Sequence, residues 1–353
     1  MANEFELEIN PLNLDWAIRN SDGLFERSRD TAMKSKFSDL AHSSDKTVKI
    51  KYSELRNFCK TIKRPFFVML LNLPPENPPV IKPRAKYKVS SYSPQTIREI
   101  RRGIWLEFAT TELIKSLNLS SKLKLKIPER EAPEAAAEII RKAMGLTISE
   151  QKDSKDAEDF YAKLIRKIEE SGAFVFEISP TPYEISGFSI SGEVPIIAIN
   201  AFEKLERRIF TLLHEYGHLL FGNSLSCGWL REEDYDNEEM WCNKFASEFL
   251  VNGESLKQLY QLYKDRSREF NIKLKEYKIS KSLVFFRFSQ KKYLDKSQYR
   301  EEVPPFVRGA KKRINKPESN KKQLYISNRF SSLIKENINQ DKINVYDYSD
   351  YVK

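Results

Sequence analysis

Three residues in the stretch RRIFTLLHEYGHLLFG, residues 207–222, carry side chains that can bind a metal ion and move a proton. On a helix, His214 and His218 lie four residues apart on one face, so their imidazole nitrogens can converge on one ion. Glu215 is then close enough to reach a water molecule on that ion and to act as a general base. The apolar neighbours indicate a buried helix, where an imidazole without a partner costs free energy. The spacing therefore predicts a metal site suited to hydrolysis.

A catalytic zinc site needs a third protein ligand and keeps one position open for water. The chain has three histidines, and the remaining one, His42, falls in a different predicted domain. A carboxylate is therefore the expected third ligand. Seven carboxylates follow the histidines in the segment REEDYDNEEMWCNKFASEFLVN, namely Glu232, Glu233, Asp234, Asp236, Glu238, Glu239 and Glu248.

Helical spacing selects among these seven carboxylates. The apolar residues of this second predicted helix form one stripe, and Glu239 lies three residues before Cys242 of that stripe, so it faces the core. Glu238 and Glu248 are expected on the flank or the outer side. Asn243, four residues after Glu239, can hydrogen-bond a ligating histidine and orient it. The alternative interpretation is that Glu239 is one exposed acid in an acidic loop.

The elements that must position these residues follow from the apolar periodicity and from the prolines. Short helices are expected across residues 12–71, followed by the segment PPENPPVIKPR, whose five prolines stop any helix. Longer helical patterns occupy 93–118, 128–145 and 154–172, and helices return from 203 to 250. Between them, runs rich in Val, Ile and Phe predict three strands of a small antiparallel sheet, at 173–179, 185–191 and 195–200.

Composition indicates a protein of more than one domain. The 353 residues are 40% hydrophobic and 31% charged, with a net charge of +10. Residues 257–322 hold 20 basic against 7 acidic residues, so the basic character belongs to one C-terminal region. Three widely spaced cysteines, Cys59, Cys227 and Cys242, do not make a disulfide framework. With no signal-peptide pattern and no apolar run long enough to cross a bilayer, we expect a cytoplasmic protein without membrane contact.

Two segments together resemble the ImmA/IrrE metallo-endopeptidases. IFTLLHEYGHLLFG followed by EMWCNKFASEFLV is similar to the family pattern FTLxHExGH and then ExxxN-FA-xxLLMP, although LVNGE stands here in place of the usual Met-Pro. The resemblance implies that His214, His218 and Glu239 are the metal ligands and that Glu215 is the general base. The segment from LDWAIRNSDG to NLPPE resembles the helix-turn-helix module that many members carry in front of the protease.

The resemblance and the patterns together predict a mostly helical α+β fold. It has a zincin-like protease core with a small antiparallel sheet and the HExxH helix, preceded by a helix-turn-helix-like domain and followed by a basic helical domain. The predicted boundaries are 1–78 for a degenerate helix-turn-helix-like domain, 79–94 for a proline-rich linker, 95–255 for the zinc metallopeptidase core and 256–353 for the basic domain. The resemblance implies a zinc-dependent endopeptidase, with other divalent metals as alternatives, that cleaves a helix-turn-helix repressor and so regulates transcription.

Other interpretations of the same residues stay open. The basic C-terminal region can bind nucleic acid, or it is a solvated face whose apolar stripe of Leu283, Phe286 and Phe288 packs on the protease. The chain can also be a DNA-binding regulator or sensor with a non-proteolytic metal site, contacting DNA through the N-terminal module or the basic region. A third alternative is a structural zinc module to which Cys227 and Cys242 contribute sulfur. The sequence predicts no particular oligomeric state.

Overall fold

The computed structural model describes most of the chain in eight segments. These are residues 5–21, 23–64, 66–74, 92–128, 131–182, 184–224, 232–303 and 324–343, and the side chains of residues 67, 222–224 and 232–236 are not described. The chain divides into two compact units, one made of Met1–Val80 and Lys88–Arg101 and the other of Ile81–Tyr87 and Arg102–Lys353. The proline-rich segment, most of the predicted linker 79–94 and Cys227 lie outside the described residues. Each unit is described below by itself.

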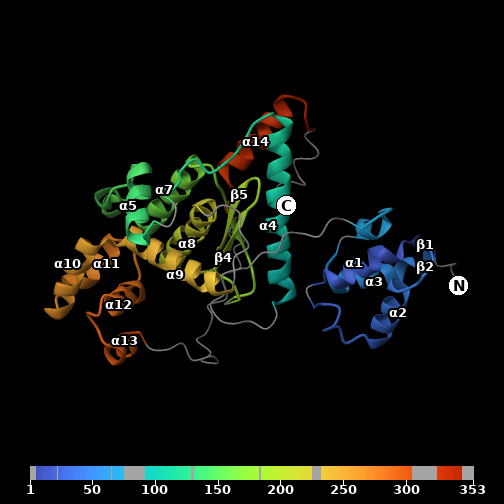
Figure 1. The fold of residues 1–353 in the computed structure, drawn as a ribbon, viewed down its shortest axis with the longest axis horizontal. Coiled ribbons are helices and arrows are strands. Elements are labelled where there is room, and N and C mark those ends of the chain that lie inside the picture. The colour runs from blue at the N-terminus through green and yellow to red at the C-terminus, as the bar shows by residue number, and fades with distance from the viewer. Residues whose placement is uncertain are drawn as a thin grey trace. The chain divides into compact units, whose positions relative to one another are not determined.

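The first unit is a small helical body, and it is coloured blue in Figure 1. Its core contains Leu55, Phe58 and Ile62, which the periodicity of the sequence places on one helix face, and Phe58 stacks on Phe37 with ring centroids 4.1 Å apart. Asn10 and Asp30 accept hydrogen bonds from backbone N–H groups at the starts of two of the helices, as side chains at N-cap positions do. The elements are α1 (Pro11–Arg19), α2 (Thr31–Ala41), α3 (Tyr52–Ile62) and the 3-10 helix η1 (Phe66–Leu70).

Two short strands of this unit were not expected from the sequence. β1 (Glu6–Ile9) pairs antiparallel with β2 (Val48–Lys51), with Ile9 opposite Val48. The alternation in Val-Lys-Ile-Lys is the signal that predicts a strand, because Val48 and Ile50 are buried while the lysines between them are exposed. Four residues are too few for that alternation to stand out beside the helical patterns on either side.

The second unit is built around a three-stranded sheet with the strand order β3-β5-β4. The expectation that the sheet is antiparallel is wrong for one of its two ladders, because β3 and β5 are parallel whereas β4 and β5 are antiparallel. A chain that turned back twice between neighbours would give the order β3-β4-β5 with antiparallel pairs throughout. Here β4 takes an outer position and β5 returns between the other two strands, so β5 runs in the direction of β3. The strands are β3 (Phe174–Ile178), β4 (Gly187–Ser191) and β5 (Pro195–Asn200).

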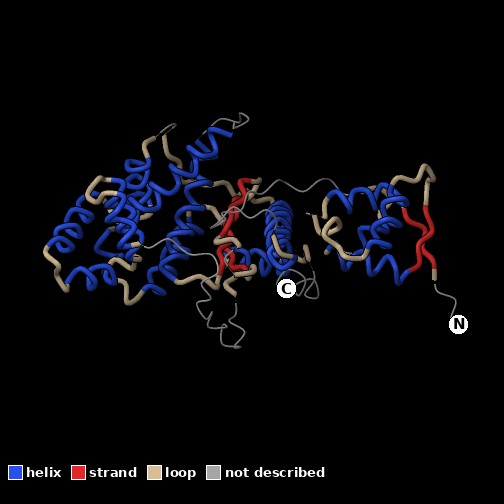
Figure 2. Tube along the Cα trace, turned by 90° about the horizontal axis from the view of Figure 1, so that it is seen from below, coloured by secondary structure: helices blue, strands red, loops and turns tan. Residues whose placement is uncertain are grey.

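Helices cover both faces of this sheet. Figures 1 and 2 show the strands between α4 (Pro94–Ser116) and α14 (Asn328–Asn339) on one side and the helices within residues 205–250 on the other. The ring of Phe330 meets that of Phe176 edge-on at 5.4 Å on the α14 side. Gly103 of α4 lies so close to the sheet that a Cβ there would come within 2.5 Å of Phe188. Ser93 caps α4 by accepting a hydrogen bond from the N–H of Thr96 at 3.3 Å.

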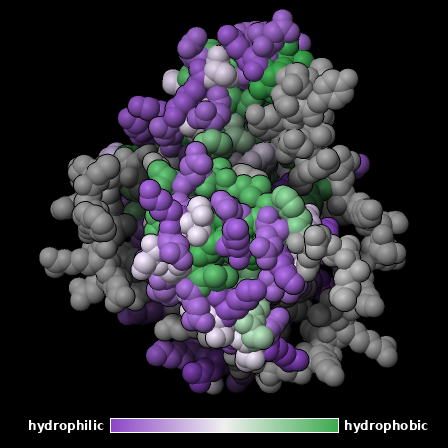
Figure 3. Space-filling model, turned by 90° about the vertical axis from the view of Figure 1, so that its right-hand side faces the viewer, coloured by the Kyte–Doolittle hydropathy of each residue, from purple (hydrophilic) through white to green (hydrophobic). Residues whose placement is uncertain are grey.

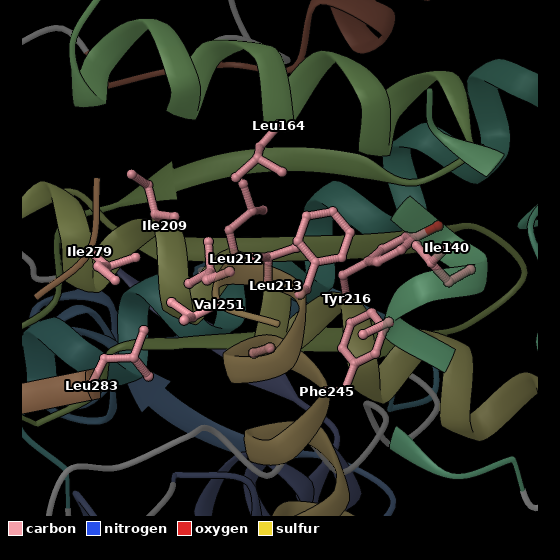
Figure 4. Close-up of a cluster of buried hydrophobic side chains, with 14 of the residues drawn as sticks. Ile140, Leu164, Ile209, Leu212, Leu213, Tyr216, Phe245, Val251, Ile279 and Leu283 are labelled. Carbon is pink, nitrogen blue, oxygen red and sulfur yellow. The ribbon is translucent and has the colours of Figure 1, made fainter. Parts of the chain in front are cut away.

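The other face of the sheet packs on the main apolar core, which Figure 4 shows in close-up. Leu212, Leu213 and Tyr216 extend from α8 (Leu205–Ser224) into a core shared with neighbouring helices and the sheet, and all three are fully buried. Phe245 extends into the same core from α9 (Glu232–Leu250). The surrounding helices are α5 (Pro133–Ala143), α6 (Ile148–Asp153) and α7 (Ala157–Glu170). The two helices predicted at 128–145 and 154–172 are confirmed in α5 and α7.

Four short helices of the basic region continue directly from α9. They are α10 (Gly253–Lys264), α11 (Glu269–Glu276), α12 (Lys281–Gln290) and α13 (Lys296–Glu302). On α12 the apolar stripe differs from the predicted one, because Leu283, Phe285 and Phe288 are buried while Phe286 is 36% exposed. The guanidinium of Arg287 is also buried, and it pairs with Glu248 of α9, so this helix is attached by charge as well as by apolar packing. The looser basic run at 304–323 lies outside the described residues.

The described helices and surface give no sign of a membrane span. Within the described ranges, no helix combines the length and the apolar content needed to cross a bilayer. The face drawn in Figure 3 carries green apolar areas that polar and charged side chains interrupt. The fold class expected from the sequence, mostly helical with small sheets, is confirmed.

Candidate metal centre

Helix α8 carries the two histidines and the glutamate in the interior of the second unit. His214 is fully buried, Glu215 is 2% exposed, and the side chain of His218 is 15% exposed. Leu212, Leu213, Leu219 and Leu220 fix the helix to the core on its other sides. The imidazole rings of His214 and His218 lie 4.8 Å apart between centroids, nearly perpendicular to each other, on the same face of the helix. This is the arrangement that a spacing of four residues predicts for a helix.

Helix α9 lies directly beside α8 where the histidines are. Gly217 permits this approach, because a Cβ at its position would meet the ring of Phe245 at 3.2 Å and Cys242 Sγ at 3.3 Å. Contacts this tight would require Phe245 or Cys242 of α9 to shift by a few tenths of an ångström, beside the residues that α9 presents to the histidines. The glycine between Tyr216 and His218 thus has a role in assembling the site.

Glu239 reaches both histidines from α9. Its Oε1 lies 3.1 Å from His218 Nε2, and its Oε2 lies 3.4 Å from His214 Nε2. The two Nε2 atoms are 3.1 Å apart. His214, His218 and Glu239 therefore form a small triangle of potential ligands, in which the two carboxylate oxygens of Glu239 each face one histidine, as expected from the helical stripe of the sequence.

This triangle has the dimensions of a zinc site. Ligand atoms held about 2.0–2.1 Å from a tetrahedral zinc ion lie about 3.3 Å from one another. Here the two Nε2 atoms are 3.1 Å apart, and the carboxylate oxygen nearer to each histidine lies 3.1 Å from His218 Nε2 and 3.4 Å from His214 Nε2. Two imidazoles and one carboxylate are a common set of protein ligands for catalytic zinc, with the fourth position left for water. The residues present therefore fit a divalent metal of this kind.

His218 is held by a carboxylate on the side away from the triangle. Its Nδ1 is 2.7 Å from Oε1 of Glu238, whose side chain is 12% exposed. A hydrogen bond to Nδ1 fixes the tautomer that leaves Nε2 free to bind a metal, and such outer partners strengthen metal sites. Glu238 was expected on the flank of α9, where a stripe of helical residues says little about contacts. A histidine that binds a metal through one ring nitrogen needs a hydrogen-bond acceptor at the other. That requirement could have pointed to Glu238.

The ionisation of the cluster matches a site that exchanges protons for a metal. Burial lowers the pKa of His218, but hydrogen bonds with Cys242, Glu238 and Glu239 outweigh burial and hold that pKa above its usual range. Burial raises the pKa of Glu239, yet the hydrogen bonds from both histidines hold it below its usual range. The carboxylate is thus charged and ready to bind a cation, and a metal must displace a proton from His218.

Glu215 points its carboxylate toward strand β4. Its Oε2 accepts a hydrogen bond of 3.0 Å from the hydroxyl of Ser189. Strand alternation places Ser189 on the α8 side of the sheet, while its neighbours Phe188 and Ile190 are buried on the other side. The serine, which the sequence did not single out, orients the glutamate beside His214 and His218.

The remaining predicted residues take other places. Asn243 is half-buried one turn beyond Glu239 and lines a cavity next to the centre, and its bond to a ligating histidine stays a prediction. Glu248 was expected on the outer side, but it is buried against Arg287 and accepts the N–H of Gly253 at 2.9 Å. His42 belongs to the first unit, where its Nδ1 contacts the carbonyl oxygen of Ser38. Nothing is described for the side chains of four of the seven carboxylates, Glu232, Glu233, Asp234 and Asp236.

Comparison with known families identifies this part of the chain. Residues 168–289 match the model of the IrrE N-terminal-like domain, Peptidase_M78, which spans the end of α7, the sheet, both helices of the centre and nearly all of α12. Among curated proteins, no sequence matches the chain significantly. The matched range contains every residue of the triangle, together with Glu215, Glu238 and Ser189. Residues 168–289 are therefore similar to the IrrE N-terminal-like peptidase domain.

Proposed function

We propose that the chain is a metal-dependent endopeptidase whose metal is zinc. The observation that carries this proposal is the convergence of His214, His218 and Glu239 within 3.4 Å of one another at a helix pair inside a peptidase-family domain. Other divalent metals accept imidazole and carboxylate ligands as well, but three such ligands in a tetrahedral spacing favour zinc. When bound, the ion supplies a nucleophilic water at neutral pH and polarises the carbonyl of the scissile bond.

Glu215 is the proposed general base. It is nearly buried, it lies one residue after a ligating histidine, and Ser189 holds one of its oxygens. Its carboxylate accepts a proton from the attacking water and delivers that proton to the leaving amine. Glu238 keeps His218 in the orientation that binds the ion, so it acts as a positioning residue. Stabilisation of the oxyanion beyond the metal is expected from a tyrosine or an arginine.

The proposed substrate is a helix-turn-helix repressor that the peptidase cuts to relieve repression. This proposal rests on the resemblance of the sequence to a family of narrow-specificity regulatory peptidases. A helix-turn-helix role for the predicted domain 1–78 and DNA binding by that domain or by the basic region are part of the same proposal. Co-expression with candidate repressors, scored for cleavage that requires Glu215, tests it.

A structural metal module is the second candidate, and one observation favours it. His218, Glu238 and the buried Cys242 also offer ligand atoms that all lie within 4.8 Å of one another. A closed site of that kind would use sulfur and would have no need of Glu215. Replacing Cys227 and Cys242 with serine separates the two candidates, because the peptidase proposal expects metal to be retained.

Metal analysis of the purified wild-type chain is the first test. We expect one zinc ion per chain, cleavage of protein substrate that stops on chelation, and loss of cleavage in Glu215→Gln without loss of metal. Glu239→Ala should lose metal affinity. A chain that purifies without stoichiometric metal and takes none up on addition would refute the assignment of the centre.

A further inference from the structure

A cavity of about 400 Å³ lies beside the metal centre. Its volume falls in the range of pockets that receive small ligands or side chains. Phe210 and Thr211 form one wall from α8, and Asn243 contributes from α9. The remaining wall comes from α12 and α13, which follow the centre by some forty residues or more in the sequence.

The cavity shares its walls with the helices that carry the metal ligands. The ring of Phe210 is 6.3 Å from the ring of His214, between centroids. Thr211 precedes His214 by three residues and Asn243 follows Glu239 by four, so each lies about one helical turn from a ligand. A polypeptide with its scissile bond at the centre therefore brings a side chain next to this cavity.

Aromatic and aliphatic side chains form part of its wall, and polar side chains, among them Ser280 and Ser282, form the rest. Leu283 and Phe286 line it from α12 and Tyr299 from α13. Phe286 remains 36% exposed although it is a large apolar residue in a helix whose other aromatic rings are buried. The exposed ring of Phe286 would gain contact area if an apolar side chain entered the cavity.

A buried hydroxyl group belongs to one of the residues that line the cavity. Thr211 is fully buried, and its Oγ1 has no hydrogen-bond partner among the described residues. Its methyl group lies under β4, where a Cβ on Gly187 would come within 2.9 Å of it. An unsatisfied buried hydroxyl costs free energy that a ligand with its own hydroxyl can recover.

Charge in the cavity disfavours ionised side chains. Arg207 lines it, but its guanidinium pairs with Glu203 at 2.8 Å and donates to Ser186 Oγ at 3.0 Å. Glu206 also lines the cavity and repels an acidic side chain, whereas a basic side chain would lose its hydration beside the phenylalanine rings of the cavity. The remaining choice is a bulky uncharged residue.

We propose that this cavity is the specificity pocket of the peptidase and that it receives an aromatic side chain adjacent to the scissile bond, with tyrosine preferred over phenylalanine. Phe210, Leu283, Phe286 and Tyr299 enclose the ring, and Thr211 Oγ1 bonds the tyrosine hydroxyl. The inference rests on the proposed peptidase function, because it assigns the substrate side chain that this function recognises.

Equilibrium binding tests the pocket without relying on cleavage. The probe is a fluorescein-labelled ten-residue peptide of alanine, serine and glycine with one central tyrosine, phenylalanine, alanine, aspartate or lysine. It is titrated by fluorescence polarisation against the full chain carrying Glu215→Gln and loaded with zinc. We expect the tyrosine peptide to bind at least tenfold more tightly than the alanine peptide, and the charged peptides to bind no better than alanine.

Two substitutions should change this preference in different ways. Leu283→Trp fills the cavity and should reduce the preference for tyrosine over alanine to less than twofold, and Phe286→Ala should weaken it without filling anything. Thr211→Val keeps the shape but removes the hydroxyl, so it should abolish the preference for tyrosine over phenylalanine and leave phenylalanine binding unchanged. Ile272→Trp, at a position 55% exposed on α11, is the matched control.

The outcomes separate the pocket from the peptidase. Equal binding of the tyrosine and alanine peptides overturns the pocket, as does an unchanged preference in both Leu283→Trp and Phe286→Ala when metal content and melting temperature are those of the parent. If the preference is present but the zinc-loaded wild type cuts no protein at all, the pocket stands and the peptidase proposal fails. If the wild type cuts protein with no preference for aromatic residues, the peptidase stands and the pocket fails.

Discussion

Replacing Glu238 with glutamine tests whether the hydrogen bond at the back of His218 supports the metal centre. The Nδ1–Oε1 separation is 2.7 Å and the glutamate side chain is 12% exposed, so the bond is short and largely shielded from water. Glutamine keeps the size and can accept the same hydrogen bond through its amide oxygen, but it removes the negative charge. The imidazole then becomes a weaker ligand and its tautomer is less strongly fixed.

The expected magnitude follows from that contact. Loss of an outer partner of a ligating histidine costs about 10–100-fold in metal affinity, which corresponds to about 1.4–2.7 kcal/mol. Glu239→Gln removes a ligand from the triangle itself, so its affinity should fall further than that of Glu238→Gln. Glu238→Gln and Glu239→Gln are therefore predicted to lower zinc affinity by different amounts, because only Glu239 points into the triangle.

Competition with a chromophoric zinc chelator at pH 7.5 measures both affinities. Glu138→Gln, an exposed glutamate on α5, controls for the change of net charge, and circular dichroism confirms the fold. An affinity of Glu238→Gln within twofold of wild type would show that the hydrogen bond contributes nothing to the centre. A larger loss for Glu238→Gln than for Glu239→Gln would refute the triangle and make Glu238 the ligand.

Three further predictions follow from other contacts. Glu215→Gln should lower the cleavage rate about 10²–10⁴-fold with unchanged metal content, and parallel loss of metal in atomic absorption would contradict a role as base. Arg287→Met leaves the carboxylate of Glu248 buried without its cation and should reduce the free energy of unfolding in urea by about 3–5 kcal/mol, whereas adding Glu248→Met should restore most of it. Burial raises the pKa of Cys59 to about 12, so its native alkylation by iodoacetamide at pH 8 should be at least about 100-fold slower than in urea, where the thiol pKa is near 8.5. That native rate should rise tenfold per pH unit from 8 to 10, and mass spectrometry showing a plateau by pH 9 would contradict the raised pKa.

Much of the centre could be predicted from the sequence because it depends on helical geometry alone. A spacing of four residues on α8 is enough to bring His214 and His218 together, and an apolar stripe is enough to turn Glu239 toward the core. Ser189 comes from a strand, and no local pattern connects that strand to the helix. Glu238 was missed because a residue on the flank of a stripe can still reach a partner on the neighbouring helix.

In the fold as well, the strands could be predicted from local sequence, whereas their order and direction could not. The runs at β3, β4 and β5 predict strands, since continuous Val, Ile and Phe suit a sheet buried on both faces. Their order and direction depend on which strand takes the middle position, and that choice is made by packing on α8 and α4. The apolar stripe of α12 was predicted with the wrong members because Phe285 and Phe286 are adjacent aromatic residues and only tertiary contacts decide which one is buried.

The division of the ligands between two helices has a thermodynamic consequence. Since α8 supplies two donor atoms and α9 the third, an ion bound to all three acts as a reversible cross-link that the unfolded chain does not possess. By mass action, free metal at about 1,000 times its dissociation constant stabilises the folded domain by about 4 kcal/mol. The melting temperature of the purified chain therefore becomes a measure of metal occupancy, and the amount of folded protein in a cell becomes coupled to the supply of the ion.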